Sequence, residues 1–169
     1  MSRLNVKSTA VNSLEYTGIV TLSQYIGGNK VTLAKFHNTG GKTLFNFLAN
    51  CLIGDFAIAE QNLPTKILLL HEDDEKTLTK ASNTGFIYLL AKPELVYSKD
   101  AESIVRYSFI IPQDFFTGSS FNAIGLYTNA ATETDIEDYA AMVNNISFDT
   151  INVSVSSVLA LDWELHISN

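Results

Sequence analysis

The sequence predicts a mainly β protein, an antiparallel β-sandwich of jelly-roll-like form with one short α-helix. Three observations predict it: short segments of alternating apolar and polar residues, Gly- or Pro-containing turns between them, and no regular strand–helix alternation of the kind that builds parallel sheets. The 169 residues have the usual size of one domain. We therefore expect a single β-sandwich domain over residues 15–169, preceded by an N-terminal arm over residues 1–14.

The first expected element is a β-hairpin. Residues 15–25 are rich in β-branched and aromatic side chains and alternate between two faces, one of which carries Val20 and Leu22. Gly27 and Gly28 tolerate positive φ and therefore predict a tight turn. Alternation then resumes over residues 30–37, which form the second strand of the hairpin.

One helix is expected after this hairpin. Apolar residues recur at helical spacing, and Gly54 stands where a helix C-cap glycine belongs. The residues that give this period are Leu44, Phe45, Phe47, Leu48, Cys51 and Leu52. Cys51 is the only cysteine, so it cannot form an internal disulfide, and we expect a buried, unreactive thiol.

The remainder of the chain reads as further strands. The continuous apolar run after Pro64, over residues 66–71, predicts a strand with both faces covered. Further strands are expected over residues 103–111, 121–128 and 160–167, the last with Leu161, Trp163, Leu165 and Ile167 inward. Short apolar pieces around Pro93 and a segment over residues 152–158 bring the expected total to about eight strands.

Charge and composition exclude several classes of function. The net charge is −7, the pI is about 4.8 and no run of Lys/Arg occurs, so we expect no nucleic acid and no membrane partner. The polar start of the chain lacks a signal-peptide core and predicts a soluble, cytoplasmic setting. Charged residues are only 17%. Either neighbouring subunits cover part of the surface, or Ser, Thr and Asn cover a large β core.

No motif in the sequence predicts a catalytic, cofactor-binding or metal site. Gly40, Gly41, Lys42 and Thr43 resemble the end of a phosphate-binding loop, but Phe36 occupies the position where that loop needs its first glycine. The acidic run over residues 72–75 lacks the alternating ligand spacing of a calcium loop and reads as a solvated loop. The histidines, which are His37, His71 and His166, have no metal-ligand spacing.

Two alternatives to a purely structural role remain open. A hydrolase with a dispersed active site would need one of the histidines beside a Ser and an Asp. A carbohydrate- or receptor-binding module for host recognition would need exposed aromatic side chains gathered on one face. The candidate tyrosines are Tyr16, Tyr25, Tyr88, Tyr97, Tyr107, Tyr127 and Tyr139.

Four segments of the sequence resemble parts of small phage virion proteins, namely tail-fibre, collar and baseplate components. They are residues 37–55 together with the following Pro64–Ile67, and residues 108–112, 123–127 and 159–167. The resemblance implies a non-enzymatic structural subunit of a bacteriophage head, neck or tail, located in the virion and assembled in the host cytoplasm. It implies a homo-oligomer that contacts other virion proteins. It brings no catalytic residues and no cofactor.

Overall fold

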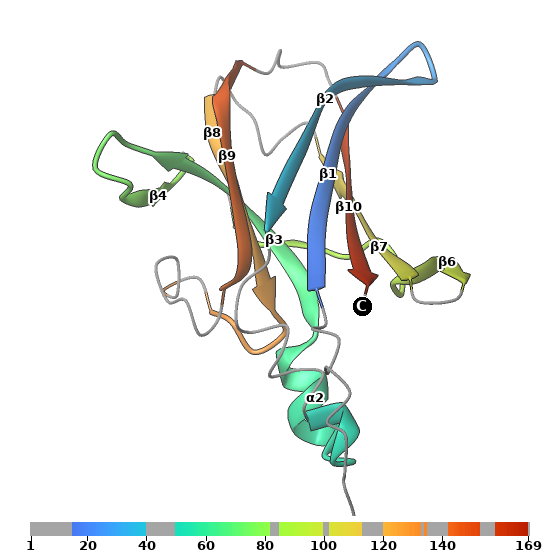
Figure 1. The fold of residues 1–169 in the computed structure, drawn as a ribbon. Helices are drawn as coiled ribbons and strands as arrows, with labels where there is room; N and C mark the ends of the chain where they lie inside the picture. Colours follow the sequence, from blue (N-terminus) through green and yellow to red (C-terminus); the bar gives the residue numbers. More distant parts are fainter. Residues whose placement is uncertain are drawn as a thin grey trace, which may run out of the picture.

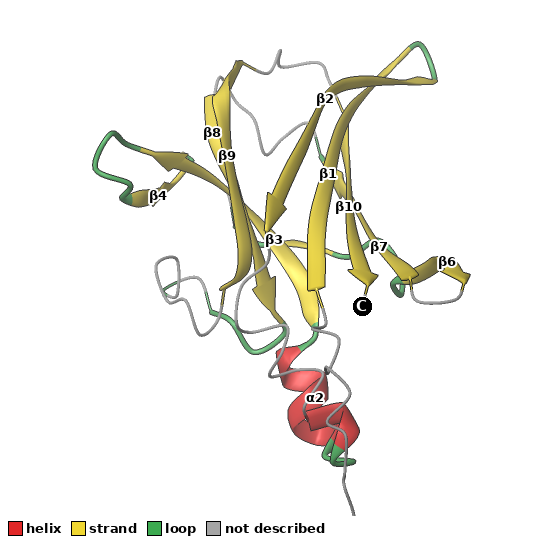
Figure 2. Ribbon diagram, in the orientation of Figure 1, coloured by secondary structure: helices red, strands yellow, loops and turns green. Residues whose placement is uncertain are grey.

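The computed structural model describes residues 15–39, 50–81, 85–99, 102–112, 120–132, 134, 142–152 and 158–168. The prediction of a mainly β, antiparallel sandwich is confirmed (Figures 1 and 2). The regular elements of the described residues are β1 (Glu15–Ile26), β2 (Asn29–Thr39), α2 (Phe56–Asn62), β3 (Pro64–Glu72), β4 (Leu78–Lys80), β5 (Ile87–Tyr88), β6 (Glu94–Lys99), β7 (Glu102–Ile111), β8 (Ser120–Thr128), β9 (Met142–Asn152) and β10 (Val158–Ser168).

The strands form two antiparallel sheets. The first sheet has the order β2-β1-β10-β7-β6. The second has the order β4-β3-β8-β9, and β5 also pairs with β3. Figure 1 shows the β1–β2 turn projecting from one end of the molecule and α2 lying at the other end. Four pairs of consecutive strands form antiparallel hairpins among the described residues: β1–β2, β3–β4, β6–β7 and β8–β9.

The first hairpin forms as predicted. Gly27 and Gly28 adopt φ values of +56° and +84°, the left-handed conformation that this turn requires. Val20 and Leu22 are fully buried, as the alternation of β1 predicts. A β-bulge interrupts the pairing with β2 at Leu33, which has no partner opposite it in β1.

The helical region differs from expectation. Residues 50–52 are helical and Gly54 follows with φ +78°, as predicted, whereas residues 44–49 lie outside the described part of the chain. The prediction of a single helix is wrong, because α2 follows directly. Its N-terminus is capped by Asp55, whose side chain accepts a hydrogen bond from the Ile58 amide at 3.2 Å. Only Ala59 of α2 is buried, so this helix has no apolar period by which it could be recognised.

A continuous apolar core fills the space between the two sheets. It contains Val20, Leu22, Ile67, Leu69, Ala81, Ile87, Tyr107, Phe109, Ile111, Phe121, Ile124, Leu126, Ile146, Leu159, Leu161, Trp163 and Leu165. On β3, Leu68 and Leu70 point the other way, into a second cluster with Phe86 and Tyr127. The prediction that both faces of this strand are covered is thereby confirmed.

Two contacts join the sheets at their edges. On one side the rings of Phe36 on β2 and Phe148 on β9 stack with centroids 4.4 Å apart. On the other side the chain after β5 crosses between the layers. The amide of Leu89 donates to the Thr65 carbonyl and the amide of Leu90 to the Ser108 carbonyl, each at 3.0 Å. The second contact ties the chain after β5 to Ser108 of β7, a strand that carries part of the polar network described next.

Candidate functional site

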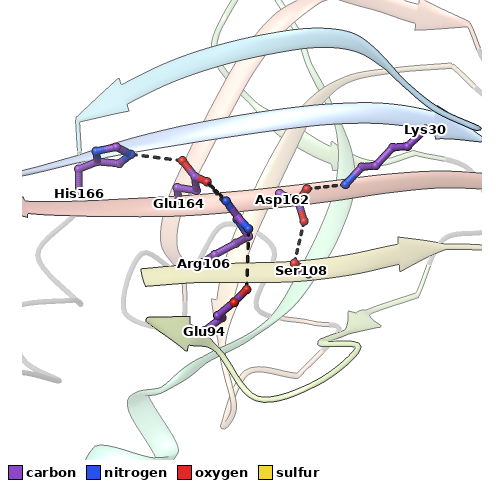
Figure 3. A network of polar contacts seen from close by, with 7 residues as sticks. All are labelled: Lys30, Glu94, Arg106, Ser108, Asp162, Glu164 and His166. Atoms are coloured by element: carbon purple, nitrogen blue, oxygen red, sulfur yellow. Dashed lines mark hydrogen bonds and ion pairs between the residues drawn. The ribbon is translucent and has the colours of Figure 1, made fainter. Parts of the chain in front are cut away.

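A network of polar side chains covers part of the outer face of the first sheet (Figure 3). The outward-pointing residues of β7 and β10 are directly paired in the sheet. Arg106 lies opposite Glu164, and Ser108 lies opposite Asp162. Lys30 joins the network from β2, and Glu94 joins it from β6. Strand alternation creates this face, because the intervening residues point into the core.

The network is held by short charge-assisted hydrogen bonds. Arg106 donates from Nε at 3.0 Å and from Nη2 at 2.7 Å, both to Oε1 of Glu164. Lys30 Nζ donates to Oδ2 of Asp162 at 2.6 Å, and the Ser108 hydroxyl donates to Oδ1 at 2.7 Å. A longer ion pair joins Arg106 to Glu94 at 3.8 Å. Both carboxylates of β10 are therefore engaged by donors.

The electrostatics of these carboxylates favour the ionised form. Burial alone would raise the pKa of Asp162, but the hydrogen bonds from Lys30 and Ser108 outweigh it and the net pKa is lowered. Burial likewise opposes ionisation of Glu164, and the hydrogen bonds from Arg106 and His166 again lower its pKa. Carboxylates with lowered pKa values are poor general acids and bases at neutral pH. We therefore interpret the network as a structural one that links β2, β10, β7 and β6.

The network predicts that the protein becomes less stable at low pH. Because the folded-state pKa values of Asp162 and Glu164 lie below their unfolded values, the stabilisation is present above the unfolded pKa and is lost as pH falls. We expect the Tm to be nearly constant from about pH 7 to about pH 5 and to fall below about pH 4. Thermal unfolding followed by circular dichroism measures this.

A matched variant separates this network from other acids. Glu164→Gln is expected to lower stability by about 1 kcal/mol at pH 7, since it removes the charged partner of Arg106. The difference between variant and wild type should shrink as pH falls below the unfolded-state pKa of the carboxyl, because the wild-type side chain then also becomes protonated. A difference that stays the same across this range would show that ionisation of Glu164 does not contribute.

The three histidines lie on three different strands, β2, β3 and β10. His166 lies beside Glu164, with Nε2 3.4 Å from Oε2, and beside Glu102, with Nδ1 3.7 Å from Oε1. His37 is exposed on β2 and His71 lies near the end of β3. Ser108 pairs with the residue four positions along β10 from His166, about 13 Å away at strand spacing.

The acidic run at the end of β3 is organised by hydrogen bonds to the protein itself. The Glu72 carboxylate accepts from Lys76 at 2.6 Å and from the Ser147 hydroxyl, which lower its pKa. Asp73 Oδ1 accepts from the amides of Glu75 at 2.9 Å and Thr77 at 2.8 Å. A search of the described residues for three or more grouped metal ligands finds none. The glycine-rich segment at 40–43 lies outside the described residues.

Sequence reasoning missed a buried lysine. Lys66 begins the apolar run of β3, yet its side chain is buried on the outer face of the second sheet. Its Nζ donates to the carbonyls of Asn129 and Ala131, both at 2.7 Å, and lies over the rings of Phe86 and Tyr88. The ammonium group thus fixes the chain after β8 against β3. The sequence did contain a signal for this buried charge, because Lys66 begins an apolar run for which both faces were expected to be covered.

Large apolar side chains are exposed in three separate groups. The hairpin group consists of Tyr25, Ile26, Val31 and Leu33, and the helix group of Leu52, Ile53, Phe56 and Ile58. The edge group, beside β7, consists of Leu90, Leu95, Val96 and Tyr97. Single exposed apolar residues are ordinary on proteins, whereas groups of neighbours mark contact surfaces. Cys51, next to the helix group, is half-buried rather than buried as expected.

The described tyrosines do not gather on one face. Among the tyrosines whose side chains the structure describes, which do not include Tyr16 and Tyr139, Tyr107 and Tyr127 are buried, and Tyr25, Tyr88 and Tyr97 are exposed. These three lie at the β1–β2 turn, over Lys66 on the second sheet, and on β6 of the first sheet, respectively. A stacking platform for a sugar needs aromatic rings side by side, and this placement among the described residues does not provide it.

Comparisons with protein-family models, curated proteins and solved structures found no match for this chain. No helix of the described residues is long and apolar enough to span a membrane.

Proposed function

We propose that this protein is a non-enzymatic structural subunit that acts through protein–protein assembly. The observation that carries the proposal is the exposure of the hairpin, helix and edge groups. They lie on different elements of one small domain, so one subunit has separate surfaces for several neighbours. Burying apolar side chains of this size against a neighbour is the main source of favourable free energy in most protein associations.

The polar part of the surface supports the same proposal. The outward-facing carboxylates of β10 are bonded to Lys30, Arg106 and Ser108. At the end of β3, Glu72 and Asp73 accept hydrogen bonds from the protein itself. Side chains so engaged are less available to bind or transform a small polar substrate. The low charged fraction, 17%, suits a surface partly covered by neighbours.

The finer proposal is that the assembly is a bacteriophage particle, as a head, neck or tail component that contacts copies of itself and other virion proteins. It rests on the resemblance of residues 108–112, 123–127 and 159–167 to phage virion proteins. These segments form parts of β7, β8 and β10, which are inner strands of the two sheets. The resembling segments in β7, β8 and β10 thus lie in the framework of the two sheets, whereas residues 37–55 include Leu52 and Ile53 of the exposed helix group.

Two measurements test the proposal together. Light scattering after size-exclusion chromatography, over a range of concentrations, is expected to give a mass above that of one chain. Mass spectrometry of particles purified from cultures that encode the protein is expected to detect it in a fixed ratio to other virion proteins. A protein that stays a single chain at high concentration and is absent from such particles would contradict the proposal.

A further inference from the structure

We propose that β6 is a self-pairing strand, through which two copies of this chain join their first sheets edge to edge in antiparallel fashion. This inference deepens the proposed function and rests on it, because it names the partner of one of the three exposed groups. The interface would be isologous, the same strand from both copies related by a twofold axis. Edge-to-edge pairing of this kind extends a sheet by main-chain hydrogen bonds.

The position of β6 makes its outer edge available. It is the last strand of the first sheet and pairs with β7 on one side; among the described residues, no strand pairs with its other side. Strand edges of this kind are usually protected by charged side chains, proline or bulges. β6 has a bulge and a charged residue at each end, but between these ends Leu95, Val96 and Tyr97 are apolar and exposed, at 62%, 39% and 41%.

The apolar edge continues beyond β6. Leu90, which is 66% exposed, is bonded through its amide to the carbonyl of Ser108 on β7. Glu94 at the start of β6 stands opposite Arg106, two residues earlier in β7. Leu90 and β6 therefore both contact the same edge of β7. The residues of the edge group thus lie in one row along that edge.

The order of charges in β6 favours pairing with itself. The strand reads Glu-Leu-Val-Tyr-Ser-Lys, so an antiparallel pair centred between Val96 and Tyr97 places Glu94 of each copy opposite Lys99 of the other. The other edge strand of this sheet, β2, lacks this property. An equivalent pair centred between Thr32 and Leu33 would set Lys30 opposite Lys35. Of the two edges of the first sheet, only the β6 edge is complementary to itself in charge.

The pairing is expected to be short and weak on its own. A bulge at Val96 interrupts the pairing with β7 and bends the strand, which limits how many residues can align with a second copy. Six paired residues and Leu90 make an interface smaller than the standard protein–protein size. We expect a dimer with a Kd on the order of 10 µM in solution. Further contacts within a particle would raise the effective affinity.

Sedimentation velocity over a concentration series tests the pairing by charge exchange. Glu94→Lys sets like charges opposite each other at both ends of the pair and is expected to weaken dimerisation by roughly tenfold. Adding Lys99→Glu to the same chain restores opposite charges and is expected to restore the wild-type Kd. The Tm of each variant shows whether the fold is intact.

A second pair of variants tests the apolar contact. Val96→Lys is expected to abolish the dimer. Thr79→Lys, at an exposed residue of β4 on the edge of the second sheet and outside the three exposed groups, is expected to leave it unchanged. Equal Kd values for wild type, Glu94→Lys and Val96→Lys would overturn the β6 proposal, and so would a wild type that stays a single chain. The protein's presence in purified particles would still support the proposed function in either case, so the two failures are distinguishable.

Discussion

Replacing Trp163 by alanine is expected to lower the free energy of unfolding by about 3–5 kcal/mol, a large part of the stability of a domain of this size. Trp163 is fully buried on β10, the middle strand of the first sheet, between Val20 on β1 and Tyr107 on β7. Removing the indole leaves a cavity that two hydrogen-bonded sheets cannot close without breaking their register. Urea unfolding followed by far-ultraviolet circular dichroism measures the change.

Trp163→Phe is the matched control. The indole Nε1 of Trp163 and the hydroxyl of Ser23 are the buried side-chain polar atoms of the described residues that have no hydrogen-bond partner. Phenylalanine keeps most of the apolar volume and removes the unsatisfied N–H, so we expect a cost below about 1.5 kcal/mol. If both substitutions cost the same, the volume of the buried ring would not be the source of the lost stability.

Gly125→Ala is expected to cost about 1–3 kcal/mol, although alanine is normally the better residue in a strand. A Cβ atom at this position would lie 2.5 Å from Cε2 of Tyr127. The ring of Tyr127 lies back over Gly125 on the outer face of the second sheet and is itself fully buried, with Phe86 packed edge-on at 5.3 Å. The ring therefore has no open space into which it could move. Chemical unfolding of the variant gives the cost.

A double-mutant cycle tests the cause of this effect. In a Tyr127→Leu background the clash is removed, and Gly125→Ala is expected to be neutral or slightly stabilising because alanine restricts the unfolded chain. A cost that is equal in both backgrounds would place the origin in the backbone conformation of β8 and exclude the ring of Tyr127.

The parts of the fold that could be predicted are those in which one side of a strand faces the core. β1 and β10 show a clean period of two, and Gly27 and Gly28 mark the turn that leads from β1 into β2. β9 was missed because two irregularities in its pairing with β8 break the alternation of Ile146, Phe148 and Ile151. α2 was missed because it buries only Ala59 and has no stripe of apolar residues.

The surface features were harder to predict than the strands. That Asp162 and Glu164 point outward follows from alternation, but their partners Ser108 and Arg106 lie more than fifty residues away. Those contacts depend on which strands are neighbours and in what register, which a single sequence does not specify. The edge group likewise depends on where β6 lies, because Leu95, Val96 and Tyr97 would be buried if another strand covered them.

The placement of β10 between β1 and β7 also bears on how the protein is made. A ribosome delivers β1 and β7 long before it delivers residues 158–168, so the first sheet cannot close until those residues have left the exit tunnel. Its closing contacts join segments more than a hundred residues apart, and such distant pairing is slow, on the order of milliseconds to seconds. Until then, the apolar side chains on the inner faces of β1 and β7 must be shielded from water by the second sheet or by chaperones.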